Sequence, residues 1–95
     1  MNKEVITKLQ KQYGVYDMQL AIIDGSIWSM EGTMGRSAMD ALETGACYLG
    51  DVHTFDYWGN RIPAISEVEE GSVGSMQNAI GYWEDVIEYE DDVLL

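Results

Sequence analysis

Residues 75–92, SMQNAIGYWEDVIEYEDD, carry the strongest structural signal in the chain. Apolar side chains recur there at i, i+3, i+4, i+7 and i+11, the spacing of one helical stripe. The stripe consists of Met76, Ala79, Ile80, Trp83 and Ile87. Ser75 stands just before it and is a favourable N-cap residue. The segment therefore predicts a long amphipathic C-terminal helix whose stripe must pack against the rest of the chain.

The acidic residues of this helix gather on a face beside the apolar stripe. They are Glu84, Asp85, Glu88, Asp91 and Asp92. Negative charge near a helix C-terminus opposes the helix dipole by about 0.3–1 kcal/mol per residue. Like charges four residues apart, such as Glu84 and Glu88, are also unfavourable. Local stability does not explain why the acids gather at this end of the helix. The remaining explanations are solubility and a cationic partner.

Length and composition predict one compact domain over residues 1–95. The chain is 46% apolar and contains three Trp and six Tyr. A disordered acidic segment would be poor in aromatic residues, so this composition favours a small folded core. The single cysteine, Cys47, excludes an internal disulfide and a zinc site built from four cysteines.

The expected fold class is α+β. Residues 2–13 predict a short N-terminal helix, because Val5, Ile6, Leu9 and Tyr13 share one face and Gly14 can end the helix. In residues 16–30, Asp24-Gly25 between two apolar runs favours a β-hairpin. A helix over residues 16–23 is the alternative, since the alternation of the two arms is imperfect.

The middle of the chain predicts a second short helix followed by irregular strands. Ala38, Met39, Ala41 and Leu42 have helical spacing. We expect Thr33 or Ser37 to cap this helix and Gly45 to end it. Residues 46–65 are rich in aromatic residues and broken by glycines and Pro63. They predict one or two short strands with turns, and Pro63 favours extended backbone at residues 60–62.

Charge is distributed unevenly along the chain. Seventeen acidic residues oppose five basic ones, for a formal net charge of −12. Lys3, Lys8 and Lys11 lie in the first twelve residues, and no basic residue follows Arg61. A chain of this charge is repelled by nucleic acid and by anionic membranes. We expect cationic partners, and the absence of an apolar leader or spanning segment predicts a cytoplasmic protein.

Three further sites are conceivable, and each has a simpler structural explanation. Asp51, His53 and Asp56 could bind a divalent ion, but their spacing fits no recognised loop and Asp beside Gly usually forms turns. Cys47 and His53 could form a nucleophilic pair, yet GACYLG suits a buried thiol of raised pKa. Arg36, beside glycines at a helix start, could bind an anion, although a structural turn explains it better.

The aromatic residues near the acids suggest a binding surface. Tyr82 and Tyr89 fall on the side of the apolar stripe away from the acids, and Tyr is favoured at interface hot spots. Tyr57 and Trp58 also lie among acids, and Trp83 is expected in the core. Glu67, Glu69 and Glu70 form a second acidic cluster that could extend the surface of the helix.

In size, charge and aromatic content the chain resembles, as a class, the small acidic DNA-mimic proteins of phages and mobile elements. Some of those proteins block restriction enzymes, some CRISPR effectors and some uracil-DNA glycosylase. The resemblance involves no motif matched residue by residue and assigns no functional residue. It implies a non-catalytic inhibitor without a cofactor, which binds a basic nucleic-acid-binding protein. The alternatives are a structural or regulatory interaction module with a solubilising surface, and a metal-dependent enzyme.

Overall fold

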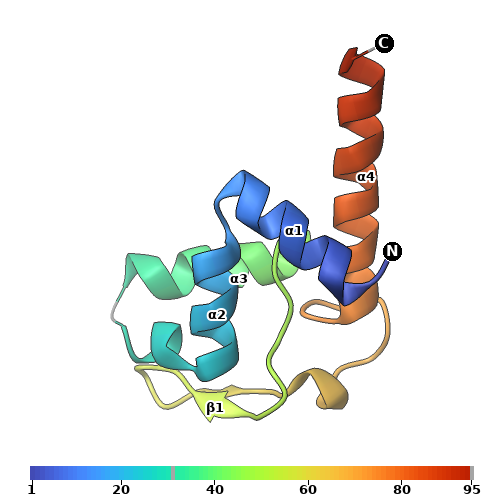
Figure 1. Ribbon diagram of the computed structural model, residues 1–95. Helices are drawn as coiled ribbons and strands as arrows, with labels where there is room; N and C mark the ends of the chain where they lie inside the picture. Colours follow the sequence, from blue (N-terminus) through green and yellow to red (C-terminus); the bar gives the residue numbers. More distant parts are fainter. Residues whose placement is uncertain (31, 95) are drawn as a thin grey trace.

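The computed structural model describes residues 1–30 and 32–94, with side chains described for residues 1–30 and 32–88. Within these ranges the fold is mostly helical, with a minimal antiparallel sheet (Figure 1). The elements are α1 (Lys3–Tyr13), α2 (Tyr16–Asp24), the 3₁₀ turn η1 (Ser26–Ser29), α3 (Thr33–Thr44), β1 (Thr54–Phe55), β2 (Arg61–Ile62), the 3₁₀ turn η2 (Ile65–Glu67) and α4 (Met76–Leu94). The α+β class is confirmed in this coarse form.

The first helix ends where the sequence predicts and begins one residue later, at Lys3. The Asn2 side chain accepts a hydrogen bond from the Val5 N–H at 3.0 Å and so caps α1. Gly14 ends the helix with a φ of 78°. That conformation is left-handed, which glycine adopts without the steric penalty of a Cβ.

The β-hairpin predicted around Asp24-Gly25 is wrong, and the helical alternative is correct. Residues 16–24 form α2, and Gly25 is its C-cap with a φ of 82°. The Asp24 carboxylate accepts the Ser26 N–H at 2.8 Å, which starts η1. Asp-Gly supplies a positive φ and a side-chain acceptor, and a helix end uses both as readily as a hairpin turn does.

The predicted middle helix is present, but its start differs from the prediction. Gly32 precedes α3 and no side chain caps it, whereas Thr33 is already the first helical residue. Ser37 lies inside the helix and donates its hydroxyl proton to the Thr33 carbonyl at 3.0 Å. Gly45 ends the helix with a φ of 100°, as predicted.

The predicted short strands form a two-residue ladder. Thr54 pairs with Ile62 and Phe55 with Arg61, in antiparallel register. The turn between them is closed by Asp56, whose carboxylate accepts the N–H groups of Trp58 at 2.9 Å and Asn60 at 2.8 Å. Two paired residues are too few to form a stable sheet alone, so this hairpin depends on its packing against η1.

Two buried glutamines tie the N-terminal helices to the segment that follows α3. Gln10 donates to the Gln19 side chain at 2.8 Å and to the Ala46 carbonyl at 2.9 Å. Gln19 in turn donates to the Tyr48 carbonyl at 2.9 Å and accepts the Tyr48 N–H at 3.0 Å. This network satisfies backbone groups of a non-helical segment that crosses the core, where unpaired polar groups would be costly.

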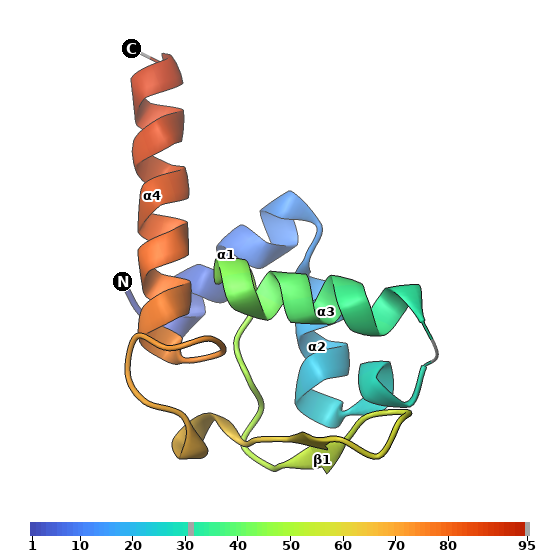
Figure 2. The ribbon, with the colours of Figure 1, turned by 180° about the vertical axis from the view of Figure 1, so that it is seen from behind.

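The core lies at the meeting of α1, α2, α3 and the N-terminal half of α4. Its fully buried side chains of largest volume include Trp83, Ile6, Ile27 and Cys47. The C-terminal half of α4 extends beyond every other element, as both Figure 1 and the reverse view in Figure 2 show. The molecule is accordingly elongated, with principal extents of 48 × 26 × 18 Å. No described helix is both long and apolar enough to cross a bilayer.

Candidate functional site

The N-terminal half of α4 is fixed in the domain by its cap and its buried stripe. The Ser75 hydroxyl accepts the Asn78 N–H at 3.1 Å, which confirms the predicted N-cap. Ala79 and Trp83 are buried, and the Trp83 indole donates to the Ala46 carbonyl at 3.2 Å. The Asn78 amide donates to the Leu42 carbonyl at 3.0 Å and links α4 to the end of α3. These contacts anchor the N-terminal half of α4 to the core.

Beyond Trp83, the described acids of α4 face solvent. Glu84, Asp85 and Glu88 are all exposed. Val86 and Ile87 are partly buried and pack on the core from the same turns. The packing of these apolar residues fixes the rotation of the helix, so the acids point outward on a defined face.

The described cations do not neutralise this acidic face. Among the described side chains the single ion pair joins Arg61 to Glu67, at 2.6 Å. The ammonium of Lys3 lies 5.5 Å from the Tyr48 ring centroid, and that of Lys11 lies 4.9 Å from the Tyr16 ring centroid. These cation–π contacts hold two of the N-terminal lysines against aromatic faces rather than against carboxylates.

The second acidic cluster lies near the base of α4, away from the projecting end. Glu67, Glu69 and Glu70 are exposed. Glu67 has a structural task, because its carboxylate accepts the Ala64 N–H at 2.7 Å and pairs with Arg61. These hydrogen bonds lower the pKa of Glu67. A helix rises about 13 Å from Ser75 to Glu84. The second acidic cluster and the acids of α4 are therefore separated along the axis of α4.

Of the two predicted aromatic anchors, Tyr82 and Tyr89, the structure describes the side chain of Tyr82. Tyr82 is partly buried, and its ring meets the Trp83 ring edge-on with centroids 4.9 Å apart. It therefore presents only part of its ring to a partner. Tyr89, Asp91 and Asp92 belong to the backbone of α4, but their side chains lie outside the described residues.

The alternative metal and nucleophile sites gain no support from the described geometry. Asp56 uses its carboxylate to close the hairpin turn, and no group of three His, Cys, Asp or Glu side chains gathers within the described residues. His53 stacks edge-on against Phe55. Cys47 is fully buried, and burial raises the pKa of its thiol to about 11, so the thiolate is strongly disfavoured.

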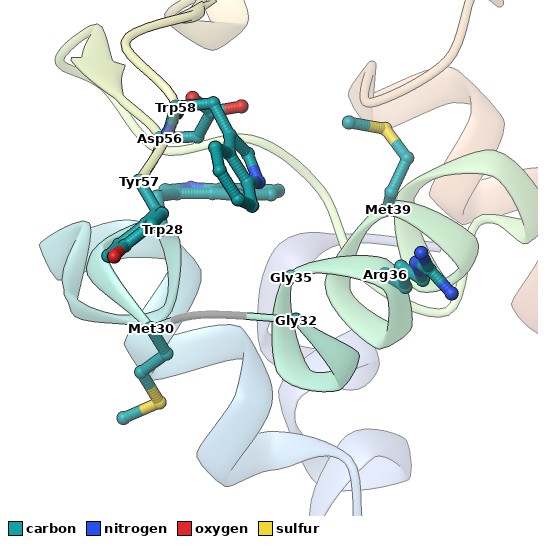
Figure 3. Close-up of a pocket in the computed structure, with 9 residues that line it drawn as sticks. All are labelled: Trp28, Met30, Gly32, Gly35, Arg36, Met39, Asp56, Tyr57 and Trp58. Atoms are coloured by element: carbon teal, nitrogen blue, oxygen red, sulfur yellow. Dashed lines mark hydrogen bonds between the residues drawn. The ribbon is translucent and has the colours of Figure 1, made fainter.

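A feature that the sequence analysis did not assemble lies on the side of the domain away from α4. There Trp28, Tyr57 and Trp58 meet the first turns of α3, which carry Arg36 (Figure 3). The sequence contained one signal for it: Tyr57-Trp58 precedes the Gly59-Asn60 turn, where large aromatic side chains project from a hairpin tip. Trp28, thirty residues earlier, could be placed beside them only by the tertiary fold.

Comparison with known proteins gives no relative from which a function could be transferred. The chain matches no family model, no curated protein and no solved structure.

Proposed function

We propose that this protein is a non-catalytic inhibitor that binds a basic, nucleic-acid-binding protein through the acidic face of α4 and competes with DNA or RNA. The target class is a host defence nuclease or a similar enzyme, as for anti-restriction or anti-CRISPR proteins. The observation that carries the proposal is that α4 projects from the domain, exposes Glu84, Asp85 and Glu88, and has no basic residue in its sequence.

The spacing of these carboxylates suits a surface that binds phosphates. Glu84 and Glu88 are one helical step of four residues apart, a rise of about 6 Å. Each DNA strand advances about 3.4 Å per phosphate, so alternate phosphates along one strand are separated by a comparable distance. Arginine and lysine side chains that contact phosphates would donate the same charge-assisted hydrogen bonds to carboxylates.

The charge of the whole chain supports the same mechanism at longer range. A formal charge of −12 attracts a basic protein and accelerates encounter at low ionic strength. Contacts between arginine and carboxylate that become desolvated at the centre of the interface would then slow dissociation. Asp91, Asp92 and Tyr89 would extend this interface, with Tyr82 at its edge. Glu69 and Glu70 would add a second contact only to a partner that reaches the base of α4.

A panel of purified DNA-binding enzymes tests the proposal. Restriction endonucleases, RNA-guided nucleases and uracil-DNA glycosylase are assayed for turnover with increasing amounts of this protein and with competing duplex DNA. We expect inhibition of at least one enzyme that DNA relieves and that weakens steeply as salt rises.

A matched pair of variants assigns the inhibition to α4. The triple variant E84Q/D85N/E88Q and the control D40N/E43Q/D51N each remove three exposed acids and change the formal charge from −12 to −9. The α4 variant should lose inhibition and the control should keep it. Equal inhibition by both variants and the wild-type protein would identify the acidic face as a solubilising surface.

A further inference from the structure

The pocket opposite α4 has a volume of about 230 Å³ and lies between a hairpin tip and the start of α3. One wall is aromatic and consists of Trp28, Tyr57 and Trp58. The other wall belongs to α3 and the residues before it, with Gly32, Gly35, Arg36 and Met39 (Figure 3). Ligand pockets are commonly about 300–1,000 Å³, so this one suits a small molecule of one or two fused rings.

The aromatic wall is exposed and held in place. Trp58 is 71% exposed and Tyr57 is 52% exposed, which is unusual for side chains of this size. Their rings meet edge-on with centroids 4.9 Å apart. The Asp56 carboxylate binds the N–H groups of Trp58 and Asn60, so the turn that carries both rings is closed by hydrogen bonds. A ring that enters the pocket meets a preformed apolar surface.

The opposite wall presents backbone donors. No side chain caps α3, and the first N–H with a helical acceptor is that of Arg36, which reaches the Gly32 carbonyl at 3.4 Å. The N–H groups before it have no partner inside the helix, and the start of a helix favours negative charge. Gly32 and Gly35 each face open space where a Cβ would stand, which leaves this backbone accessible.

Trp28 adds an independent donor on the aromatic wall. The side chain is 3% exposed, yet its indole N–H has no hydrogen-bond acceptor within the described structure. The other buried tryptophan behaves differently, because Trp83 donates to the Ala46 carbonyl. A buried N–H without an acceptor is uncommon in folded proteins, and an oxygen of a bound molecule would supply one.

The described charged side chains at the pocket are Asp56 and Arg36. The Asp56 carboxylate keeps its negative charge, but it is hydrogen-bonded to N–H groups of the hairpin turn. Arg36 is exposed and has no ion pair with any described side chain. Figure 3 shows its guanidinium at the rim, directed away from the rings, where a long side chain can turn toward a ligand.

We propose that this pocket binds a small planar aromatic acid. The ring of the ligand would pack against Trp58 and Tyr57. Its carboxylate or phosphate oxygens would accept hydrogen bonds from the start of α3 and from the Trp28 indole, with Arg36 closing over the anionic group. This site is separate from the acidic face of α4 and does not depend on the function proposed for that face.

Nuclear magnetic resonance tests the proposal on the full chain. The three tryptophans give three indole N–H signals in a ¹H–¹⁵N spectrum, which W28F and W58F assign. Indole-3-acetate and phenyl phosphate are titrated in a phosphate-free buffer, with 3-methylindole as the uncharged ring and acetate as the anion without a ring. We expect both aromatic acids to shift the Trp28 indole signal and the amide signals of Gly35 and Arg36.

Three variants make the test specific. W58A removes an exposed ring and should weaken binding by about tenfold or more, because stacking on an aromatic side chain has about that effect. R36Q should weaken the acids but not 3-methylindole, whereas K8Q removes an exposed cation elsewhere and should change nothing. The acid that binds more tightly, phenyl phosphate or indole-3-acetate, identifies the class of ligand as a phosphate or a carboxylate. Unshifted Trp28 and Gly35 signals at millimolar ligand, or equal binding of 3-methylindole and indole-3-acetate, would overturn the proposal.

Discussion

The two halves of α4 lie in different surroundings. Its first half carries Ala79 and Trp83 into the core and is linked to α3 through Asn78. Glu84, Asp85 and Glu88 are exposed around the middle of the helix, and its second half then leaves the domain (Figure 1). The first half fixes the direction of the helix and the second half displays charge along that direction. Substitutions of the buried residues should therefore change stability, whereas substitutions of the exposed acids should change binding if the function proposed above is correct.

The largest expected effect comes from Trp83. W83A removes a buried side chain that contacts the rings of Tyr13 and Tyr82 and donates to the Ala46 carbonyl. Truncation of a buried tryptophan should lower the free energy of unfolding by about 3–5 kcal/mol. Urea unfolding followed by circular dichroism measures this loss. A change below about 1 kcal/mol would contradict the role assigned to the first half of α4.

The close approach of α3 to α4 predicts the next effect. A Cβ at Gly45 would lie 2.6 Å from the Asn78 carbonyl oxygen, at a φ of 100°. G45A should therefore destabilise the protein by about 2–3 kcal/mol.

G14A provides the matched control for this substitution. Gly14 also has a left-handed φ, of 78°, but nothing lies within 4 Å of its Cβ position. G14A should cost about 1–2 kcal/mol for the backbone conformation alone. Equal losses of thermal stability in G14A and G45A would show that the contact with α4 is unimportant.

Alkaline pH should destabilise the core against which the first half of α4 packs. Burial raises the pKa of the Cys47 thiol from 9.0 to about 11, and it also raises the pKa of Tyr48. The neutral thiol is thus favoured in the folded state, and this contribution is complete below pH 9 and is lost as the pH rises to about 11. For Cys47 the loss should be about 2–3 kcal/mol.

A substitution of Cys47 tests whether this thiol causes the loss of stability at alkaline pH. C47A should reduce the dependence of unfolding free energy on pH between 9 and 11, whereas the triple α4 variant should retain it. A pH dependence that is identical in C47A and the wild-type protein would assign the alkaline loss to other groups.

The smallest effect is expected from the acids of α4. E84Q/D85N/E88Q should leave the fold intact and raise stability by up to about 1 kcal/mol, because acids toward a helix C-terminus oppose its dipole. Moderate sodium chloride should raise the melting temperature of the wild-type protein by screening the same repulsion, and should raise that of the variant less. A variant that melts at a lower temperature than the wild-type protein would indicate that these acids stabilise the fold.

The sequence by itself determined the elements whose signals are local. Apolar spacing predicted α1 and α4, Ser75 predicted the cap of α4, and Gly14 and Gly45 predicted two helix ends. It also determined the acidity of the C-terminal helix and the outward position of Glu84, Asp85 and Glu88, because the apolar stripe fixes which face must be buried. These features depend on residues fewer than a dozen positions apart.

Tertiary structure decided the features that depend on distant residues. Asp24-Gly25 fits a hairpin turn and a helix end equally well, and packing selected the helix. Gln10 and Gln19 have the polarity of surface residues, but the chain buries both because the Ala46 and Tyr48 backbone needs partners inside the core. The aromatic pocket likewise joins Trp28 to Trp58 and α3. In each case the stabilising partner is far along the sequence, so local pattern carries no information about it.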